Sequence, residues 1–206
     1  MPACGLFVVS VPSVAVSPSV TVPNTPAPQN SPSVLVFGIN FDGKYRGFAY
    51  LNGEFKYKPN PEKDNWTGDW EKVSGDALAG TLDENGAGNI DAPEAGFYMM
   101  EVDLTAMTYK HTLISTLGVI GSATPSGWDA DTDMTYNEED GSWNLTTNLT
   151  DGEIKIRANN DWDINWGGSI AEPTFNAGNI AVTAGNYTIR FIPQCDGMNL
   201  LTLTKN

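Results

Sequence analysis

The most constraining feature of this chain of 206 residues is an internal repeat. Four blocks recur in the same order in the two halves of the sequence. The first copy comprises residues 53–60, Trp66 with Trp70, residues 87–90 and residues 95–98. The second copy comprises residues 152–159, Trp162 with Trp166, residues 177–180 and residues 184–187. Each copy spans about 80 to 95 residues, the size of a small β-sandwich, so the repeat predicts two tandem modules.

Composition and local pattern favour strands over helices. Glycine (21 residues) and proline (13 residues) are frequent, which favours short strands joined by many turns. No apolar stripe at helical spacing is sustained. In the second copy, Ile154 and Ile156 alternate with Lys155 and Arg157, as expected of a strand that buries one face. We therefore expect an all-β protein of two tandem β-sandwich domains.

The two modules are expected at residues 33–115 and 116–206. Residues 1–32 are rich in Pro, Ser, Val and Thr, and proline removes hydrogen-bond donors from a strand. We interpret residues 1–32 as a flexible linker or as the remnant of a preceding domain, because valines also alternate within them.

The charge of the chain excludes some partners. The formal net charge is -14, and such an acidic surface repels nucleic acid backbones and anionic membranes. It does not repel neutral sugars. No stretch is long and apolar enough to span a bilayer. We expect no nucleic acid partner, and membrane association only through a lipid anchor that is not evident in this chain.

The loop after the second-copy strand has the composition of a sugar-binding site. It places Trp162 and Trp166 among Asn and Asp side chains. An aromatic face stacks on the C–H face of a sugar ring, whose hydroxyl groups need donors and acceptors. Both tryptophans are therefore candidate ligand-binding residues, with Trp162 expected outward and Trp166 packed inward. The alternative is that both fill the core, since tryptophan is usually buried.

Two cations and a further tryptophan extend this candidate site. Lys155 and Arg157 are expected on the face opposite the core, and Lys56 and Lys58 occupy the matched positions of the first copy. The alternative is that these cations form only the solvated face of an edge strand. Trp128 lies on another loop, where it is either a second platform or a lid on the sandwich end.

Catalysis and metal binding have little support in the sequence. One His and two Cys do not supply a Cys/His zinc site. Asp129, Asp131 and Asp133 alternate as calcium ligands can, but Met134 stands where such a loop needs glycine. No acidic residue recurs inside an apolar run that would raise its pKa for glycoside hydrolysis. We expect no enzyme activity, no cofactor and no metal.

The second copy also carries an ordered set of longer motifs. They are residues 120–129 (IGSATPSGWD), 134–135 (MT), 152–168 (GEIKIRANNDWDINWGG) and 184–187 (AGNY). Together they resemble the SusE/SusF family, the outer-membrane starch-utilisation proteins E and F of Bacteroidetes. The first copy resembles the same module more loosely and lacks the early Trp.

The resemblance implies two tandem immunoglobulin-like domains in a surface-exposed outer-membrane lipoprotein. It implies that starch-type α-glucan is bound without hydrolysis, alongside other outer-membrane glycan-uptake proteins. The site residues that it implies in the second module are Trp128, Lys155, Arg157, Asn159 and Trp162. Their counterparts in the first module are Lys56, Lys58, Asn60 and Trp66.

Three hypotheses follow for the function. The first is non-catalytic binding of an oligosaccharide or polysaccharide at the bacterial cell surface. The second is a structural or adhesion module whose tryptophans belong only to the core, so that replacing Trp162 would unfold the second module. The third is an enzyme, which would turn over an oligosaccharide rather than only bind it.

Overall fold

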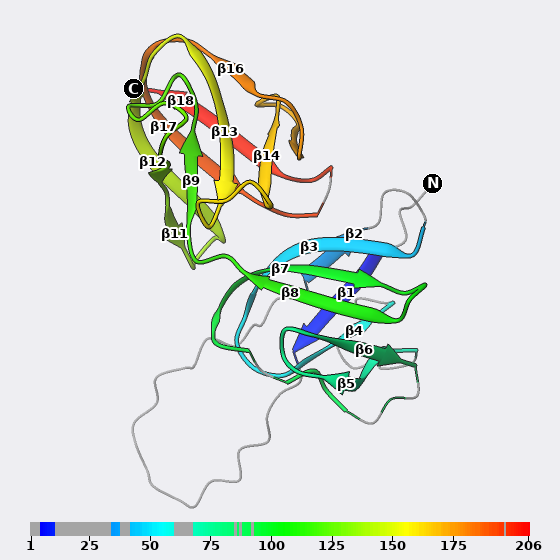
Figure 1. The fold of residues 1–206 in the computed structure, drawn as a ribbon. Helices are drawn as coiled ribbons and strands as arrows, with labels where there is room; N and C mark the ends of the chain where they lie inside the picture. Colours follow the sequence, from blue (N-terminus) through cyan, green and yellow to red (C-terminus); the bar gives the residue numbers. More distant parts are fainter. Residues whose placement is uncertain are drawn as a thin grey trace, which may run out of the picture.

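The structure of this protein is a computed structural model. The structure describes residues 5–10, 34–37, 42–59, 68–84, 86, 88–91, 93–195 and 197–206. These described residues form antiparallel strands and turns and contain no helix (Figure 1), which confirms the all-β expectation with β-sandwich domains. Among them, no helix is long and apolar enough to cross a membrane.

The first eight strands form one antiparallel sheet in the order β4-β1-β2-β3-β7-β8-β6-β5. The strands are β1 (Gly5–Ser10), β2 (Val34–Phe37), β3 (Lys44–Leu51), β4 (Phe55–Lys58), β5 (Glu71–Gly75), β6 (Ala79–Asp83), β7 (Gly96–Asp103) and β8 (Thr108–Leu113). The sheet curls until its two edges meet. At that point Tyr57 and Trp70 form an antiparallel bridge, in which the Trp70 N–H donates to the Tyr57 carbonyl over 2.7 Å.

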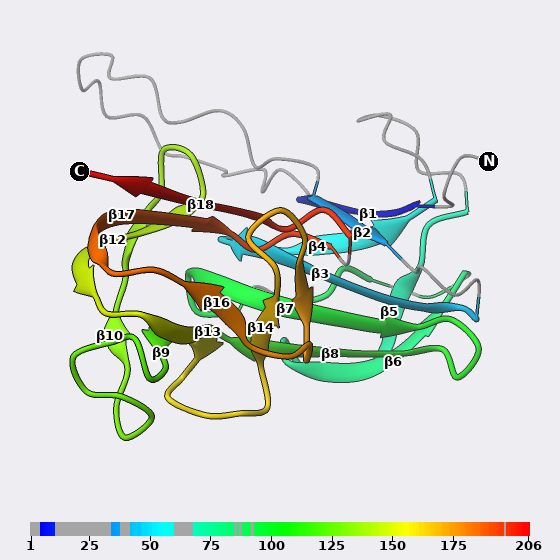
Figure 2. The same cartoon turned by 90° about the horizontal axis from the view of Figure 1, so that it is seen from above.

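The remaining strands form a sandwich of two layers, which Figure 2 shows in profile. One layer has the order β10-β9-β13-β14-β15, with β16 paired to β13, and the other has the order β11-β12-β17-β18. The strands are β9 (Leu117–Ile120), β10 (Thr132–Asp133), β11 (Thr135–Asn137), β12 (Ser142–Leu149), β13 (Gly152–Ala158), β14 (Asn165–Gly168), β15 (Pro173–Phe175), β16 (Ile180–Val182), β17 (Gly185–Ile192) and β18 (Leu200–Lys205).

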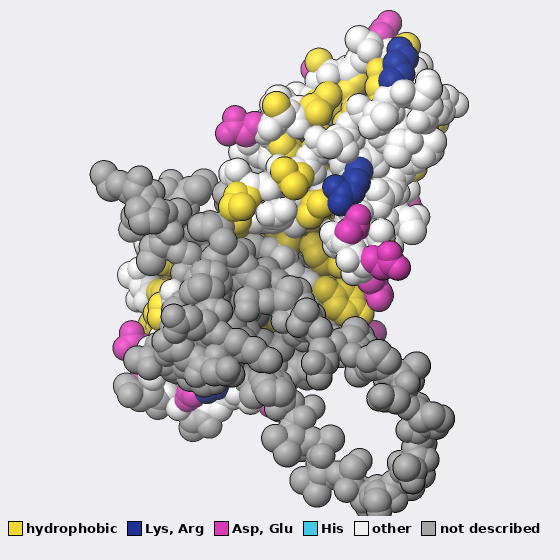
Figure 3. Space-filling model, turned by 180° about the vertical axis from the view of Figure 1, so that it is seen from behind, with side chains coloured by type: hydrophobic (Ala, Val, Ile, Leu, Met, Phe, Trp, Pro, Cys, Tyr) yellow, Lys and Arg dark blue, Asp and Glu magenta, His cyan; other side chains and the backbone are white. Residues whose placement is uncertain are grey.

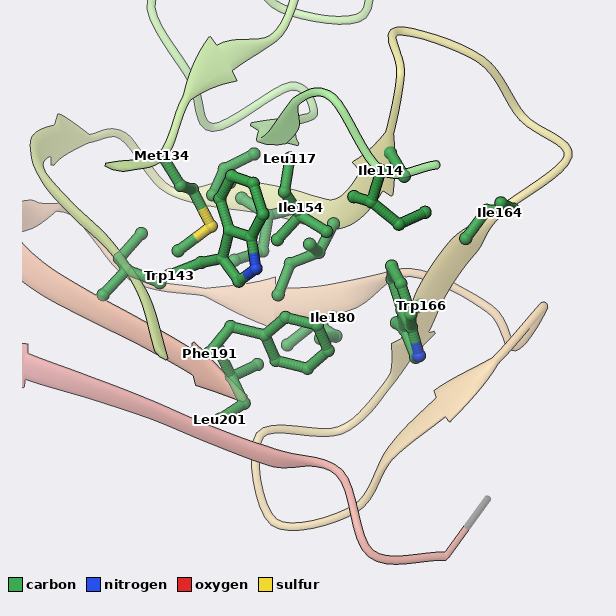
Figure 4. Packing of buried hydrophobic residues seen from close by; sticks show 14 of the residues in the cluster. Ile114, Leu117, Met134, Trp143, Ile154, Ile164, Trp166, Ile180, Phe191 and Leu201 are labelled. Carbon is green, nitrogen blue, oxygen red and sulfur yellow. The ribbon is translucent and has the colours of Figure 1, made fainter. Parts of the chain in front are cut away.

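The space between the two layers is filled by apolar side chains (Figure 4). Ile154 and Ile156 point into it from β13 and are fully buried, as the alternation in the sequence predicts. Trp143 is also buried there and contacts Phe97 of the first module. Seen from behind, hydrophobic side chains are also spread over the surface of the second module, with few Lys or Arg between them (Figure 3).

The structure pairs the repeated blocks in the same way in both modules. In the first module Phe55 bridges Ile90. At the matched positions of the second module, Ile154 pairs with Ile180. A one-residue change in register would turn these side chains to the opposite face. The two copies of the repeat therefore fold into the same local arrangement.

Side-chain hydrogen bonds repeat as well. In the first module the Asn89 amide donates to the Glu54 carboxylate over 2.9 Å. In the second module the Asn179 amide donates to the Glu153 carboxylate over 2.8 Å. This equivalent contact between equivalent residues shows that the repeated blocks share their local arrangement.

Within the segment 1–32, the first strand changes the interpretation of residues 5–10. Gly5–Ser10 (β1) pairs with β2 and β4, so this segment belongs to the sheet of the first module rather than to a linker or a preceding domain. Its register places Val8 opposite Tyr57, just as β9 places Val119 opposite Ile156 in the second module. Residues 1–4 and 11–32 lie outside the described part of the chain.

The two modules share an aromatic interface. The rings of Phe48 and Trp166 lie 5.2 Å apart between centroids. Tyr50 stacks on Tyr136 at 6.1 Å with an interplanar angle of 7°, and Phe97 lies 5.3 Å from the same ring. One buried cluster therefore contains residues of both modules, and such a desolvated aromatic contact holds the modules together.

Candidate functional site

Two tryptophans lie side by side on the surface of the second module. Trp128 is 40% exposed and Trp162 is 44% exposed. Their ring centroids are 6.2 Å apart, and the ring planes are inclined by 41°. The two residues come from different loops and are far apart in the sequence. Because large aromatic side chains usually bury most of their surface, an exposed pair of this kind marks a candidate binding surface.

Two cations of β13 approach the Trp162 ring. The guanidinium carbon of Arg157 lies 4.5 Å from its centroid, and the Lys155 ammonium lies 5.9 Å from it. Both distances are within the range of a cation–π contact. The cations therefore orient the Trp162 ring and place hydrogen-bond donors close to it.

A buried ion pair holds Arg157 in this position. Its Nε donates to the Asp131 carboxylate over 2.7 Å, and both side chains are almost completely buried. Asp131 immediately precedes β10, which pairs with β9, and β9 in turn pairs with β13. In the sequence, Asp131 is a candidate only for a calcium ligand, because no local signal links it to Arg157.

Lys155 is held by the backbone of a neighbouring segment. Its ammonium donates to the Ala177 carbonyl over 2.7 Å. Burial lowers the pKa of Lys155 below its ordinary value. Lys155 thus presents a positive, partly buried group beside the Trp162 ring.

Tight turns form the two loops. In the first loop the Thr124 hydroxyl donates to the Gly121 carbonyl over 3.0 Å, and Gly127 adopts a φ of 60°, a conformation that suits glycine. In the second loop the Asn165 amide donates to the Trp162 carbonyl over 2.7 Å. These contacts fix the backbone beneath both tryptophans.

The Asn159 side chain is hydrogen-bonded to residues near the connection between the modules. Its carboxamide oxygen accepts hydrogen bonds from the N–H groups of Ser115, at 2.8 Å, and Thr116, at 3.3 Å. Its amide donates to the Leu113 carbonyl over 2.8 Å. The side chain is therefore hydrogen-bonded to the segment that joins the modules.

Trp166 is packed inward, as the sequence analysis expects of it, and is fully buried. Its ring contacts Phe48, Phe175 and Phe191. A side chain without exposed surface cannot stack on a ligand, so Trp166 is a core residue and not a ligand-binding residue.

The matched residues of the first module form a different arrangement. Lys56 makes ion pairs with Asp69, at 3.0 Å, and with Glu71. Lys58 is fully buried, which corrects the expectation that it points to solvent. Asn60 and Trp66 lie outside the described residues.

The first module also differs in the segment that corresponds to the Trp128 loop. Since β1 is the counterpart of β9, the counterpart of this loop is residues 11–33, which contain no tryptophan. The Trp128–Trp162 pair is therefore a feature of the second module. Within the described part of the chain, no group of three or more His, Cys, Asp or Glu side chains is arranged to hold a metal ion.

The fold and this site define a protein of two β-sandwich modules with an exposed aromatic pair. Comparison with known proteins adds one partial family match, because a model for a "Domain of unknown function (DUF8037)" matches residues 35–113. No curated protein matches the chain.

Among solved structures, the crystal structure of SusF from Bacteroides thetaiotaomicron aligns with 100% of this chain and 50% of the SusF chain, at 14% sequence identity and a TM-score of 0.37. This chain thus spans half the length of that SusF chain. An alignment at this identity and TM-score defines neither the fold nor the activity of this protein.

Proposed function

We propose that the second module binds a polysaccharide without hydrolysing it, with Trp128 and Trp162 as the stacking platforms. The single observation that carries this proposal is the exposed, inclined pair of indole rings. A sugar ring offers an apolar C–H face to an aromatic ring and polar hydroxyl groups at its edge. The indole rings contact the C–H face of the sugar, and Lys155 supplies a hydrogen-bond donor for its hydroxyl groups.

The rigidity of the site supports the same proposal. Arg157 is locked by Asp131 and stacks on Trp162, so the platform is held before a ligand arrives. A preorganised side chain loses less conformational entropy on binding. A platform of this kind binds a flexible sugar chain at a lower entropic cost than a mobile one.

The inclination of the rings favours a curved glycan. Two rings at 41° cannot both lie flat against a straight, ribbon-like chain, but they can contact successive residues of a chain that turns. An α-linked glucan turns in this way, and the sequence motifs resemble a family of starch-binding proteins. We therefore propose a starch-type α-glucan as the ligand, bound by a cell-surface protein attached to the outer membrane.

Affinity electrophoresis tests this function. Native gels are cast with amylopectin, xylan or mannan, and the wild-type chain is compared with Trp162→Ala and with Leu200→Ala. Leu200 is an exposed apolar residue of the same module, 51% exposed, and serves as the control. Retardation of the wild type and of Leu200→Ala by amylopectin, lost in Trp162→Ala, is expected.

Each other outcome of this experiment supports a different function. Retardation by xylan or mannan alone would replace α-glucan by that glycan class. No retardation in any gel would favour a structural or adhesion module. Release of reducing sugar from amylopectin during incubation would contradict a purely binding role.

A further inference from the structure

A polar groove lies between the two modules. One wall is the face of the first sheet that is turned toward the second module. Arg46 of β3 is paired with Glu101 of β7, and Glu101 is paired with Lys110 of β8. Directly opposite residues on neighbouring strands point to the same side of a sheet, so the three charged side chains form one row.

The other wall comes from the second module. It is formed by Asp163 and Ile164 of the β13–β14 loop and by Phe175 and Asn176 at the end of β15. Figure 1 shows that loop at the end of the second module nearest to β3 and β7. The groove encloses about 350 Å³, and the Arg46 guanidinium crosses it to lie 3.9 Å from the Phe175 ring.

The lining of the groove selects a class of ligand. Arg46 and Lys110 are donors with positive charge, while Glu101 and Asp163 are acceptors with negative charge. An anionic ligand meets two carboxylates and a cationic ligand meets two cations, so neither charge is favoured. A neutral, polyhydroxylated molecule both donates and accepts at each hydroxyl group, and it fits such a mixed lining.

The groove and the tryptophan pair use neighbouring residues of the same loop. Asp163, in its wall, directly follows Trp162 in the same loop. Asn176, also in its wall, directly precedes Ala177, whose carbonyl holds the Lys155 ammonium. The loop that carries the Trp162 ring therefore also contributes Asp163 to the wall of the groove.

We propose that the groove between the modules is a second subsite for the glycan chain that binds at Trp128 and Trp162. The inference rests on the proposed function of that pair. It assigns the first module a part in binding through Lys110 and Glu101. Ligands too short to reach the groove engage only the aromatic rings.

Isothermal titration calorimetry with maltotriose and maltoheptaose tests the inference. The full chain is compared with Lys110→Ala, which removes an exposed groove side chain, and with Lys72→Ala on β5 as the control. The wild type and the control should bind maltoheptaose more tightly than maltotriose. In Lys110→Ala the affinity for maltoheptaose should fall by about tenfold, the lower end of the scale for one hydrogen bond from a charged group, with maltotriose unchanged. Asp163→Ala, on the opposite wall, should reproduce this pattern.

The outcomes separate the two proposals. Equal loss of affinity for both sugars in Lys110→Ala, or no loss for either, would overturn the groove subsite while leaving the tryptophan site in place. Wild-type binding that does not depend on chain length would also overturn it. If neither sugar binds the wild type, the α-glucan proposal and the groove subsite fail together.

Discussion

The Asn159 side-chain amide donates a hydrogen bond to the Leu113 carbonyl, 2.8 Å away, and this contact ties the start of the Trp162 loop to the segment between the modules. Asn159 also has a φ of 55°, in the left-handed region that Asn tolerates better than most residues. Asn159 therefore links the loop that carries Trp162 to the connection between the modules.

Replacing Asn159 by glycine should lower the free energy of unfolding by about 1–2 kcal/mol, because the partly exposed connection loses three hydrogen bonds. Glycine keeps the left-handed backbone without strain, so the change reports the side chain. The neighbouring Asn160 has the same φ of 55° and is exposed, so Asn160→Gly is a matched control. Denaturant unfolding of the two variants should differ; identical curves would contradict a stabilising role of the Asn159 side chain.

Trp162 and Trp166 should respond in opposite ways to replacement by alanine. Trp166→Ala removes a fully buried ring at the module interface and should lower stability by about 3–5 kcal/mol. Trp162→Ala removes an exposed ring and should change stability by less than about 1 kcal/mol. Thermal unfolding followed by circular dichroism gives both values. Unfolding of the second module in Trp162→Ala would instead support a core role for this residue.

The Asp131–Arg157 pair should matter for both folding and binding. Asp131→Asn leaves a buried Arg157 without its carboxylate, which should lower stability by about 3–5 kcal/mol and loosen the guanidinium against the Trp162 ring. Asp133→Asn, at an exposed position two residues on, is the control. Chemical denaturation and tryptophan fluorescence measure the two effects. A variant as stable as the control would show that the pair contributes little.

The first module should lose stability in mild acid through His111. Burial lowers the pKa of His111 from 6.5 to about 4, and the neutral ring accepts a hydrogen bond from the Tyr57 hydroxyl at 2.5 Å while its other nitrogen donates to the Ala77 carbonyl. Because the unfolded state binds the proton first, stability should fall as the pH decreases from about 6.5 to about 4, by up to about 3 kcal/mol. Below about pH 4, protonation of His111 should not change the stability further.

The control for this pH dependence is His111→Gln, whose amide can also donate to Ala77 and accept from Tyr57. The unfolding free energy of the wild type minus that of the variant should decrease as the pH falls through this range, since carboxylates titrate in both proteins and cancel. A difference that stays constant from pH 7 to pH 4 would contradict the account of His111.

The strands with internal alternation could be predicted from the sequence. The alternation of Ile154 and Ile156 predicts the buried face of β13. The repeat predicts a second module in which the matched strands pair in the same way. The strand Gly5–Ser10 could not be recognised, because its partners lie after residue 33 and a proline-rich segment intervenes. Lys58 was expected in solvent, since alternation reports the face of a strand but not what covers that face.

The candidate site was predictable in composition but not in geometry. Trp162, Lys155 and Arg157 follow from one strand and the loop after it. That Trp128 lies beside Trp162, and that Asp131 locks Arg157, depends on sheet register between distant segments. The groove between the modules depends on their packing, which a motif in either module alone does not encode.

The most direct test of the central claim is the affinity of the whole chain for maltoheptaose, measured by calorimetry for the wild type and for the double variant Trp128→Ala/Trp162→Ala. The account predicts saturable binding by the wild type, a loss of at least about tenfold in the double variant, and an unchanged unfolding temperature within a few degrees. Equal affinity of the two folded proteins would contradict the assignment of these rings as the glycan-binding platform.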